Sequence, residues 1–261
     1  MVNPHITAAR TANAAGLAKE SVQAGRFKLT AYSRLDATGG PLTVFIEGDG
    51  RAWLSKYRLS EDPTPLHPVG LELAAADHSV NVVYLARPCQ YKGRDTDDAC
   101  KDPAYWSDRR FSEEVIVSMD EAISVFSERI KASGVRLVGY SGGAAVAVLV
   151  AARRNDVSFL VTVAGNLDPE YVNKHHGVDP LKTSLNPMDF ASKISAIPQV
   201  HFSGSEDRVI PPSVAGRFVK AVNSPYAKHQ EVAGISHHGG WKERWPDLSD
   251  RLVRVLHLEG G

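Results

Sequence analysis

The sequence is short of three things: excess charge of either sign, cysteine, and long apolar runs. Its 261 residues carry 30 Lys and Arg against 30 Asp and Glu, so nothing indicates binding to nucleic acid or to an anionic membrane. No uninterrupted apolar run approaches the roughly 18 residues that a membrane span needs. Internal repeats and low-complexity linkers are also missing. With 43% apolar and 23% charged residues, the composition is that of an ordinary globular protein.

The N-terminal stretch lacks the features of an export signal. Residues 1–23 are rich in alanine but have neither a basic start nor an apolar centre, which a signal peptide combines. The protein is therefore either cytoplasmic, or exported with a signal that has been removed from this sequence.

The two cysteines, Cys89 and Cys100, lie in one polar stretch of loop composition. Two free thiols would suit a cytosolic protein, but free cysteines favour buried apolar surroundings. A metal site would need more ligands than this stretch offers. We therefore expect a disulfide, and with it an oxidising compartment and a periplasmic or otherwise exported protein, with a cytoplasmic location as the alternative.

Buried β-rich runs alternate with helical patterns along the chain. Strands are predicted at residues 26–34 (an outer strand), 42–46, 81–86, 135–138, 158–164, 199–203 and 229–232. Helices are predicted at 6–22, 71–77, 112–130, after 143, at 212–222 and from 241, with 51–69 and 165–197 irregular. Such alternation predicts a mainly parallel sheet with helices on both faces. We expect one α/β domain over residues 1–261, with an N-terminal helical segment (1–25) and a short cap-like insert (165–197).

The most informative stretch surrounds Ser141. A β-rich run leads into Gly139-Tyr-Ser-Gly-Gly143, and a helical run that is apolar on every side follows at once. This is the nucleophile-elbow arrangement, in which a serine sits on a strained turn with its hydroxyl exposed. Gly139 and Gly143 stand where a Cβ would collide with the neighbouring strand or helix. Glycine-rich turns also bind phosphates, but the context favours Ser141 as a nucleophile.

A serine nucleophile needs a base to take its proton and an acid to orient that base. Ligands of parallel sheets collect beyond the carboxyl ends of the strands, so the candidates are residues that follow strands. His237 and His238 follow the last predicted strand, and we favour His237 as the base, with His238 as the alternative. We favour Asp207, which follows the strand before it, as the acid. Glu206 and Asp168 are the alternatives.

Acyl transfer also needs hydrogen-bond donors aimed at the oxyanion. The backbone N–H of Gly142, next to the nucleophile, is one such donor in an elbow. The second is expected from the loop Glu47-Gly-Asp-Gly50, whose glycines let the backbone approach a substrate closely. We favour the N–H of Asp49, with that of Gly50 as the alternative, and expect the Asp49 side chain to hold the loop.

The order Ser141, Asp207, His237 on a parallel sheet resembles the α/β-hydrolase superfamily, over residues 42–258. Residues 87–91, residues 105–112 and the elbow also resemble poorly characterised bacterial α/β-hydrolases, many of them exported or lipid-anchored. One departure is that many members have His-Gly in the oxyanion loop, where this chain has Glu47-Gly. We expect Glu47 to point away from the oxyanion and to pair with a base such as Arg51.

The resemblance implies a serine hydrolase, and we expect one that cleaves small-molecule carboxylic esters through an acyl-serine intermediate. This chemistry requires no metal or cofactor, and thioester or amide hydrolysis would use the same groups. The short insert suggests an open site. The alternative is a non-catalytic binding or scaffold protein that has kept the fold. All the residue types of a triad stand at fitting positions, which favours the enzyme.

Overall fold

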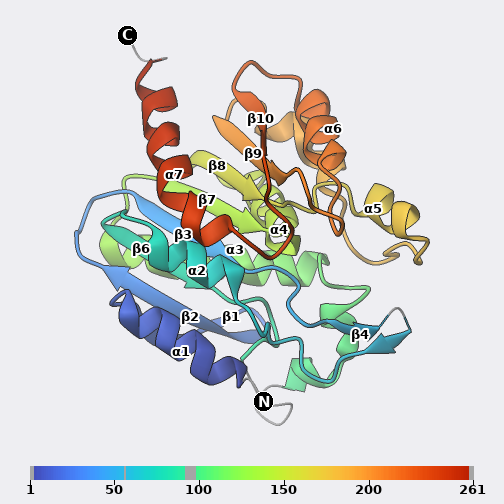
Figure 1. The fold of residues 1–261 in the computed structure, drawn as a ribbon. Coiled ribbons are helices and arrows are strands. Elements are labelled where there is room, and N and C mark those ends of the chain that lie inside the picture. The colour runs from blue at the N-terminus through green and yellow to red at the C-terminus, as the bar shows by residue number, and fades with distance from the viewer. Residues whose placement is uncertain (1–2, 56, 92–97, 259–261) are drawn as a thin grey trace.

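An eight-stranded sheet runs through the centre of the molecule (Figure 1). The computed structural model describes residues 3–55, 57–91 and 98–258. In spatial order the strands are β1 (Ala18–Ala24), β2 (Phe27–Leu35), β6 (Asn81–Leu85), β3 (Leu42–Ile46), β7 (Val135–Tyr140), β8 (Val157–Val163), β9 (Gln199–Gly204) and β10 (Ala227–Val232). From β6 to β10 all neighbours pair in parallel, whereas β2 pairs antiparallel with both β1 and β6. The prediction of a mainly parallel sheet is confirmed.

Helices cover both faces of this sheet (Figure 1). One face carries α1 (Pro4–Ala14), α2 (Val69–Ala76) and α7 (Trp241–Leu258), and the other carries α3 (Glu113–Ile130), α4 (Gly142–Ala151) and α6 (Ser213–Val222). Within the described part of the chain, no helix has both the length and the apolarity required to cross a membrane.

Two apolar cores, one on each face, hold the layers together. The helix α4 is buried on every side, because it packs against the sheet as well as against α3. In α3, Val115, Met119 and Phe126 are buried on a single face, as the spacing predicts. On the opposite face Trp241 and Trp245 of α7 are each 1% exposed. Burial of such aromatic side chains is a major source of folding free energy.

The expectation of a helical segment over residues 1–25 is wrong in its second half. The helix α1 ends at Ala14, and Gly16 follows with φ +69°, a left-handed conformation that suits glycine. Residues 18–24 then form β1, which pairs with β2 along its whole length. The sheet gains an edge strand in this way, and β2 is the second strand of the sheet instead of the outer one.

Two segments predicted as irregular contain regular structure. The insert 165–197 holds α5 (Pro169–His176) and a 3₁₀ helix, η4 (Pro187–Ile194). The side chain of Asp168 caps α5 by accepting from the N–H of Tyr171, and Gly177 ends it with φ +59°. Residues 51–69 include a small hairpin of β4 (Trp53–Ser55) and β5 (Arg58–Leu59). The cap residue Asp168 and the left-handed Gly177 set the bounds of α5, and hydrophobic periodicity does not reveal such bounds.

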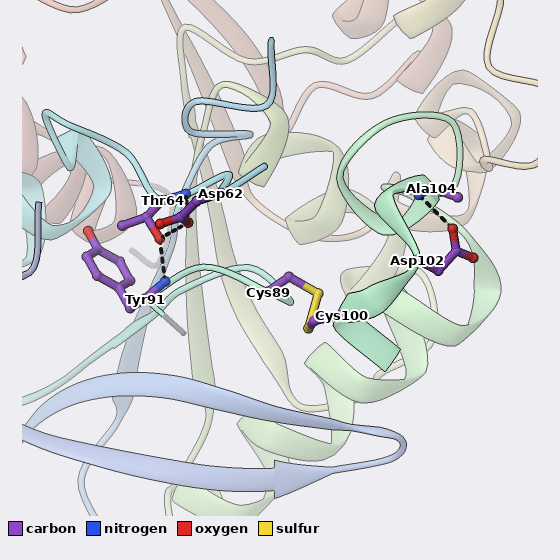
Figure 2. The surroundings of a disulfide bond; sticks show 7 residues. All are labelled: Asp62, Thr64, Cys89, Tyr91, Cys100, Asp102 and Ala104. Carbon is purple, nitrogen blue, oxygen red and sulfur yellow. Dashed lines mark hydrogen bonds between the residues drawn. A yellow bond between two sulfur atoms is a disulfide. The ribbon is translucent and has the colours of Figure 1, made fainter. Parts of the chain in front are cut away.

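A disulfide ties down the long connection after β6 (Figure 2). The sulfur atoms of Cys89 and Cys100 are bonded at 2.13 Å, with the Cα atoms 5.3 Å apart. Cys100 belongs to the 3₁₀ helix η2 (Asp98–Lys101), which is followed by η3 (Pro103–Trp106). Near Cys89, the N–H of Tyr91 donates to Thr64 Oγ1 at 2.7 Å. The beginning of this connection is thus fixed both covalently and by a hydrogen bond.

Candidate active site

Ser141 occupies the sharp turn between β7 and α4. Its backbone has φ +51° and ψ −119°, a combination uncommon for a residue with a side chain. The N–H of Ser141 donates to the carbonyl of Val163 at 3.0 Å, and the carbonyl of Ser141 accepts from the N–H of Asn166 at 2.9 Å. The strand β8 and the loop that follows it therefore hold the strained turn in place.

The glycines on either side of Ser141 are required by close approach, as predicted. A Cβ at Gly139 would lie 2.5 Å from the Cα of Ala144 in α4. A Cβ at Gly143 would lie 2.2 Å from the carbonyl oxygen of Ile46, at the end of β3. Without side chains at these positions the helix begins directly against the sheet, which leaves Ser141 at the tip of the turn.

The structure brings Ser141, His237 and Asp207 into one hydrogen-bonded chain. Ser141 Oγ lies 3.0 Å from His237 Nε2, and His237 Nδ1 lies 2.7 Å from Asp207 Oδ2. A carboxylate can only accept hydrogen bonds, so the ring proton stands on Nδ1 and Nε2 is left to accept from the serine hydroxyl. The side chains of His237 and Asp207 are 5% and 0% exposed, so water competes little for these contacts.

Backbone groups hold the acid and the histidine in position. Asp207 Oδ1 accepts from the N–H groups of Val209 and Ile210, both at 2.8 Å. The carbonyl of His237 accepts from the hydroxyl of Tyr140 at 2.9 Å and from the indole N–H of Trp241 at 3.1 Å. The Asp207 carboxylate and the main chain of His237 are therefore both held in place.

The adjacent histidine, His238, faces a different partner. Its Nδ1 lies 2.9 Å from the hydroxyl of Tyr140. Because that hydroxyl donates to the carbonyl of His237, Nδ1 of His238 donates to it in turn. Burial and the neighbouring His237 lower the pKa of His238. His237 therefore contacts Ser141, whereas His238 contacts Tyr140.

The two alternative acids lie in other environments. Asp168 Oδ2 accepts from Nη2 and Nε of Arg217 at 3.1 and 3.3 Å, while Oδ1 caps α5. The Glu206 side chain is exposed to solvent. The carboxylate that contacts His237 is that of Asp207.

The loop after β3 packs directly on the nucleophile. A Cβ at Gly48 would lie 3.1 Å from the Cβ of Ser141, and a Cβ at Gly142 would lie 2.1 Å from Asp49 Oδ1. Gly50 has φ +64°, and a Cβ there would lie 2.1 Å from the carbonyl oxygen of Pro63. Across the turn, the N–H of Gly142 belongs to the first turn of α4, where N–H groups have no acceptor within the helix. This arrangement is compatible with an oxyanion hole formed by Asp49 and Gly142.

The expected pairing of Glu47 with Arg51 is wrong. The Glu47 carboxyl is 1% exposed, whereas Arg51 is exposed at the surface. Oε1 accepts from the N–H of Gly48 at 2.9 Å and from that of Gly70 at 3.1 Å, and Oε2 accepts from the hydroxyl of Tyr84 at 3.1 Å. Burial raises the pKa of Glu47 to about 7, against the lowering effect of these donors. The side chain points beneath the loop, toward the N-terminus of α2.

Sequence reasoning missed several side chains that support the site. Gln90 Nε2 donates to the carbonyl of Gly48 at 2.9 Å, and Arg87 forms an ion pair with Asp49. Asn166 is 4% exposed, and its Oδ1 has no hydrogen-bond partner. A polar residue two or three positions after a buried strand was the available signal for Arg87 and Asn166. Over the described ranges, no group of at least three His, Cys, Asp or Glu side chains is arranged to hold a metal ion.

Solved structures of α/β hydrolases resemble nearly the whole chain. A putative lipase (lip1) from Acinetobacter baumannii AYE matches with a TM-score of 0.63 at 14% identity, covering 99% of this chain and 97% of that one. The Pyrococcus furiosus esterase Pf2001 matches with 0.61 at 13% identity, covering 93% and 92%. An alpha-beta serine hydrolase homologue from Coxiella burnetii matches with 0.60 at 19% identity, covering 91% and 96%. The fold is therefore the α/β-hydrolase fold, in a single domain.

The family follows from a sequence comparison. The model of the serine hydrolase (FSH1) family matches residues 68–240, a range that includes Ser141, Asp207 and His237. The chain belongs to the serine hydrolase (FSH1) family. A comparison with curated proteins finds no match. The expected superfamily and the general class of hydrolase are confirmed, and a small-molecule substrate is implied by the family.

Proposed function

We propose that the protein hydrolyses carboxylic esters through an acyl-serine intermediate. Ser141 Oγ attacks the carbonyl carbon while His237 Nε2 takes its proton, and the N–H groups of Asp49 and Gly142 stabilise the oxyanion. The C–O bond to the alcohol then breaks, and the alcohol leaves with the proton from His237. Water attacks the acyl-serine with His237 again as base, which releases the carboxylic acid and restores Ser141. Asp207 keeps the imidazole in the required tautomer and stabilises its charged form.

One observation carries this proposal: the continuous hydrogen-bonded chain from Asp207 through His237 to Ser141. The two contacts of 2.7 and 3.0 Å lie within the range expected for a nucleophile, its base and the group that orients the base. A scaffold protein that had only kept the fold would have no need to keep these three side chains aligned. The relatives named esterase and lipase support the same chemistry.

The insert between β8 and β9 supports a preference for short acyl groups. The N–H of Leu185 donates to the carbonyl of Phe111, and the N–H of Lys182 donates to Asp108 Oδ1. Ser184 Oγ donates to the carbonyl of Asp108 and accepts from the N–H of Phe111. These bonds fasten the insert to the segment before α3. Because the insert is short and fastened in this way, little of it is left to form a lid over the site. We therefore infer an open site in place of a deep acyl tunnel, and acetyl and butyryl esters are expected to outperform long-chain esters.

Labelling by a fluorophosphonate probe tests the proposed nucleophile. The folded wild-type protein is expected to be labelled, and Ser141→Ala is expected to remain unlabelled. A series of p-nitrophenyl esters with graded acyl length then tests both ester hydrolysis and the short-chain preference. A folded protein without labelling, or labelling that is unchanged in Ser141→Ala, would favour the scaffold alternative.

We also propose that the protein works in an oxidising compartment, periplasmic or otherwise exported. Disulfides persist in such compartments and are rare in the cytosol. The bond between Cys89 and Cys100 supports this location. Alkylation of the protein directly in its host cells, followed by mass measurement with and without reductant, tests the proposal. Alkylation of both cysteines without prior reduction would contradict it.

A further inference from the structure

Three charged side chains meet beside Gly142, the residue that follows the nucleophile. Asp49 Oδ1 lies 3.3 Å from Arg87 Nη1, and Asp49 Oδ2 lies 3.1 Å from Arg110 Nε. The carboxylate is so close to Gly142 that a Cβ there would lie 2.1 Å from Oδ1. We refer to Asp49, Arg87 and Arg110 as the arginine cluster. It adjoins the proposed oxyanion hole.

The arginine cluster contains two positively charged guanidinium groups and one carboxylate, so it has a net charge of one positive unit. Burial lowers the pKa of Arg87 to about 10, with Asp49 acting in the opposite direction, so this guanidinium is protonated at neutral pH. The side chains of Arg87 and Arg110 are only 5% and 12% exposed. Burying a second cation costs desolvation free energy, and one guanidinium would have been enough to hold Asp49. Glu47 also favours the charge on Arg87, so the charge left without a carboxylate of its own is that of Arg110.

The two guanidinium groups are held in defined orientations. Both lie against the ring of Phe111, with Cζ atoms 5.3 and 5.2 Å from its centroid. Arg87 Nη2 donates to the carbonyl of Arg110, and Arg110 Nη1 donates to the carbonyl of Ser107 at 3.1 Å. Arg87 Nε is buried without a hydrogen-bond partner, and Arg110 Nε is buried facing Asp49 Oδ2, so neither Nε is open to a ligand. The part of the Arg110 guanidinium that remains exposed is held in a fixed orientation, which suits it to bind an anion.

We propose that Arg110, supported by Arg87 and Asp49, determines specificity by binding a carboxylate group of the ester substrate next to the scissile carbonyl. This inference rests on the proposed ester hydrolase function. The partial exposure of Arg110 (12%) and Asp49 (24%) lets a substrate reach them, whereas Arg87 is buried. The flat guanidinium matches the two oxygens of a carboxylate. A single excess charge suits a monoanion better than a doubly charged phosphate.

The position of the arginine cluster limits where the carboxylate stands in the substrate. Gly142 supplies the proposed oxyanion donor, so the scissile carbonyl lies over the same residue that Asp49 contacts. A short acyl chain or a small leaving group is then enough to bridge the carbonyl and Arg110. The preferred substrates are accordingly half-esters of short dicarboxylic acids, or esters whose leaving group carries a carboxylate.

Two pairs of esters test this proposal, each with one acidic and one neutral member. On the acyl side, p-nitrophenyl hydrogen adipate is compared with p-nitrophenyl hexanoate, which has the same chain length. On the leaving-group side, 3-acetoxybenzoate is compared with its methyl ester. The wild type is expected to prefer the acidic member of at least one pair by about 10- to 100-fold in kcat/KM, the usual effect of a charge-assisted hydrogen bond. The gain should appear mainly in KM, because the contact is equal in ground and transition states.

Variants of neighbouring arginines provide the matched controls. Arg110→Gln is expected to bring the ratio of acidic to neutral kcat/KM close to one, with some loss of activity toward both esters because Arg110 also holds Asp49. Arg110→Lys is expected to keep part of the ratio, because the charge remains. Arg109→Gln should keep the full preference, since Arg109 instead pairs with Glu114 at 2.7 Å and stacks on Tyr105. Circular dichroism and thermal unfolding check that each variant is folded.

The outcomes separate this inference from the proposed function. Neutral and acidic esters hydrolysed equally well in both pairs, or a preference that survives in Arg110→Gln, would overturn the carboxylate site and leave the ester hydrolase intact. If no ester is hydrolysed and the fluorophosphonate does not react, the proposed function fails. In that case, calorimetry with Ser141→Ala measures binding of the same ester pairs without hydrolysis and tests the carboxylate site by itself. Tighter binding of the acidic ester that is lost in Ser141→Ala/Arg110→Gln supports the site. Equal binding of the acidic and neutral esters overturns it.

Discussion

The carboxylate of Asp49 fills the space that a side chain at position 142 would need. A Cβ on Gly142 would lie 2.1 Å from Oδ1 and 2.5 Å from Cγ of Asp49. Arg87 and Arg110 hold that carboxylate in place, so it cannot simply swing away. The glycine after the nucleophile is therefore required by a side chain from the opposite loop.

Gly142→Ala is expected to lower kcat by about 10²- to 10³-fold, because displacement of Asp49 or of the turn removes one oxyanion donor. The same substitution in an Asp49→Ala background should cost much less, since the clash is gone. Steady-state kinetics of the four proteins measures this coupling. Gly134→Ala is the control, because its Cβ would meet Ser158 Oγ at an ordinary 3.4 Å. Equal losses in both backgrounds would contradict the steric explanation.

The two adjacent histidines should differ sharply in their effect on turnover. His237→Ala is expected to reduce kcat by a factor on the order of 10⁶, as for other bases that act together with a serine. His238→Ala should stay within about tenfold of the wild type, because it removes only a partner of Tyr140. Measurement of kcat on one ester with both variants decides the assignment, and the reverse order of activities would show that His238 is the base.

Substitution of Asp207 should affect mainly catalysis, and substitution of Asp168 mainly stability. Asp207→Asn is expected to lower kcat by about 10⁴-fold, since the amide disfavours the required imidazole tautomer. Asp168→Asn loses an ion pair with the half-exposed Arg217, so about 1 kcal/mol of stability and little activity should be lost. Urea unfolding and steady-state kinetics are measured on both variants. A large loss of kcat in Asp168→Asn would indicate that Asp168, and not Asp207 alone, acts as the acid that orients the base.

The outline of the site could be predicted from the sequence because local patterns encode it. Buried β-runs fix the strands, the glycines around Ser141 mark the elbow, and parallel strands bring their following loops to one edge. The choice between His237 and His238 as the base could not be made from such local patterns. Neighbouring side chains point in different directions, and only the backbone path between Gly234 and Gly240, both with positive φ, decides which one faces Ser141.

The partners of Glu47 and Asp49 could not be predicted, for a related reason. They come from segments far away in the chain, such as Gly70, Arg87 and Arg110, and no periodicity connects them. A nearby arginine was the natural guess for Glu47, but burial makes backbone N–H groups and the hydroxyl of Tyr84 the available donors. The strand β1 was missed because only Val22 and Ala24 of its seven residues are buried, and the inward position before them is held by the polar Glu20, which hides the apolar alternation in the sequence.

Reduction of the disulfide should affect both stability and turnover. Cys89 is bonded to Cys100, and the next residue, Gln90, donates to the carbonyl of Gly48 in the proposed oxyanion loop. Loss of the bond is expected to cost up to about 3 kcal/mol, which lowers Tm by roughly 5–10 °C for a chain of this size. A modest fall in kcat should accompany it as the loop loosens. Thermal unfolding and kinetics of Cys89→Ser/Cys100→Ser measure both, and added reductant should not change this variant further. An unchanged Tm would show that the bond does not constrain the fold.

The buried carboxyl of Glu47 should make stability depend on pH near neutrality. Its folded-state pKa of about 7 lies above the ordinary 4.5, with burial as the main cause, so the folded protein holds this proton more tightly than the unfolded chain. The contribution is therefore complete below about pH 4.5 and is lost as the pH rises through 7, by about 3 kcal/mol in total.

Glu47→Gln removes this titration and keeps an oxygen that accepts from Gly48 and Gly70. Urea unfolding at several values between about pH 5 and 8 should show the wild type losing about 3 kcal/mol relative to Glu47→Gln as the pH rises. Glu128→Gln, at an exposed position of α3, is the matched control and should follow the wild-type curve. Parallel curves for the wild type and Glu47→Gln would mean that Glu47 titrates alike in the folded and unfolded protein, and that the hydrogen bonds from Gly48, Gly70 and Tyr84 offset its burial.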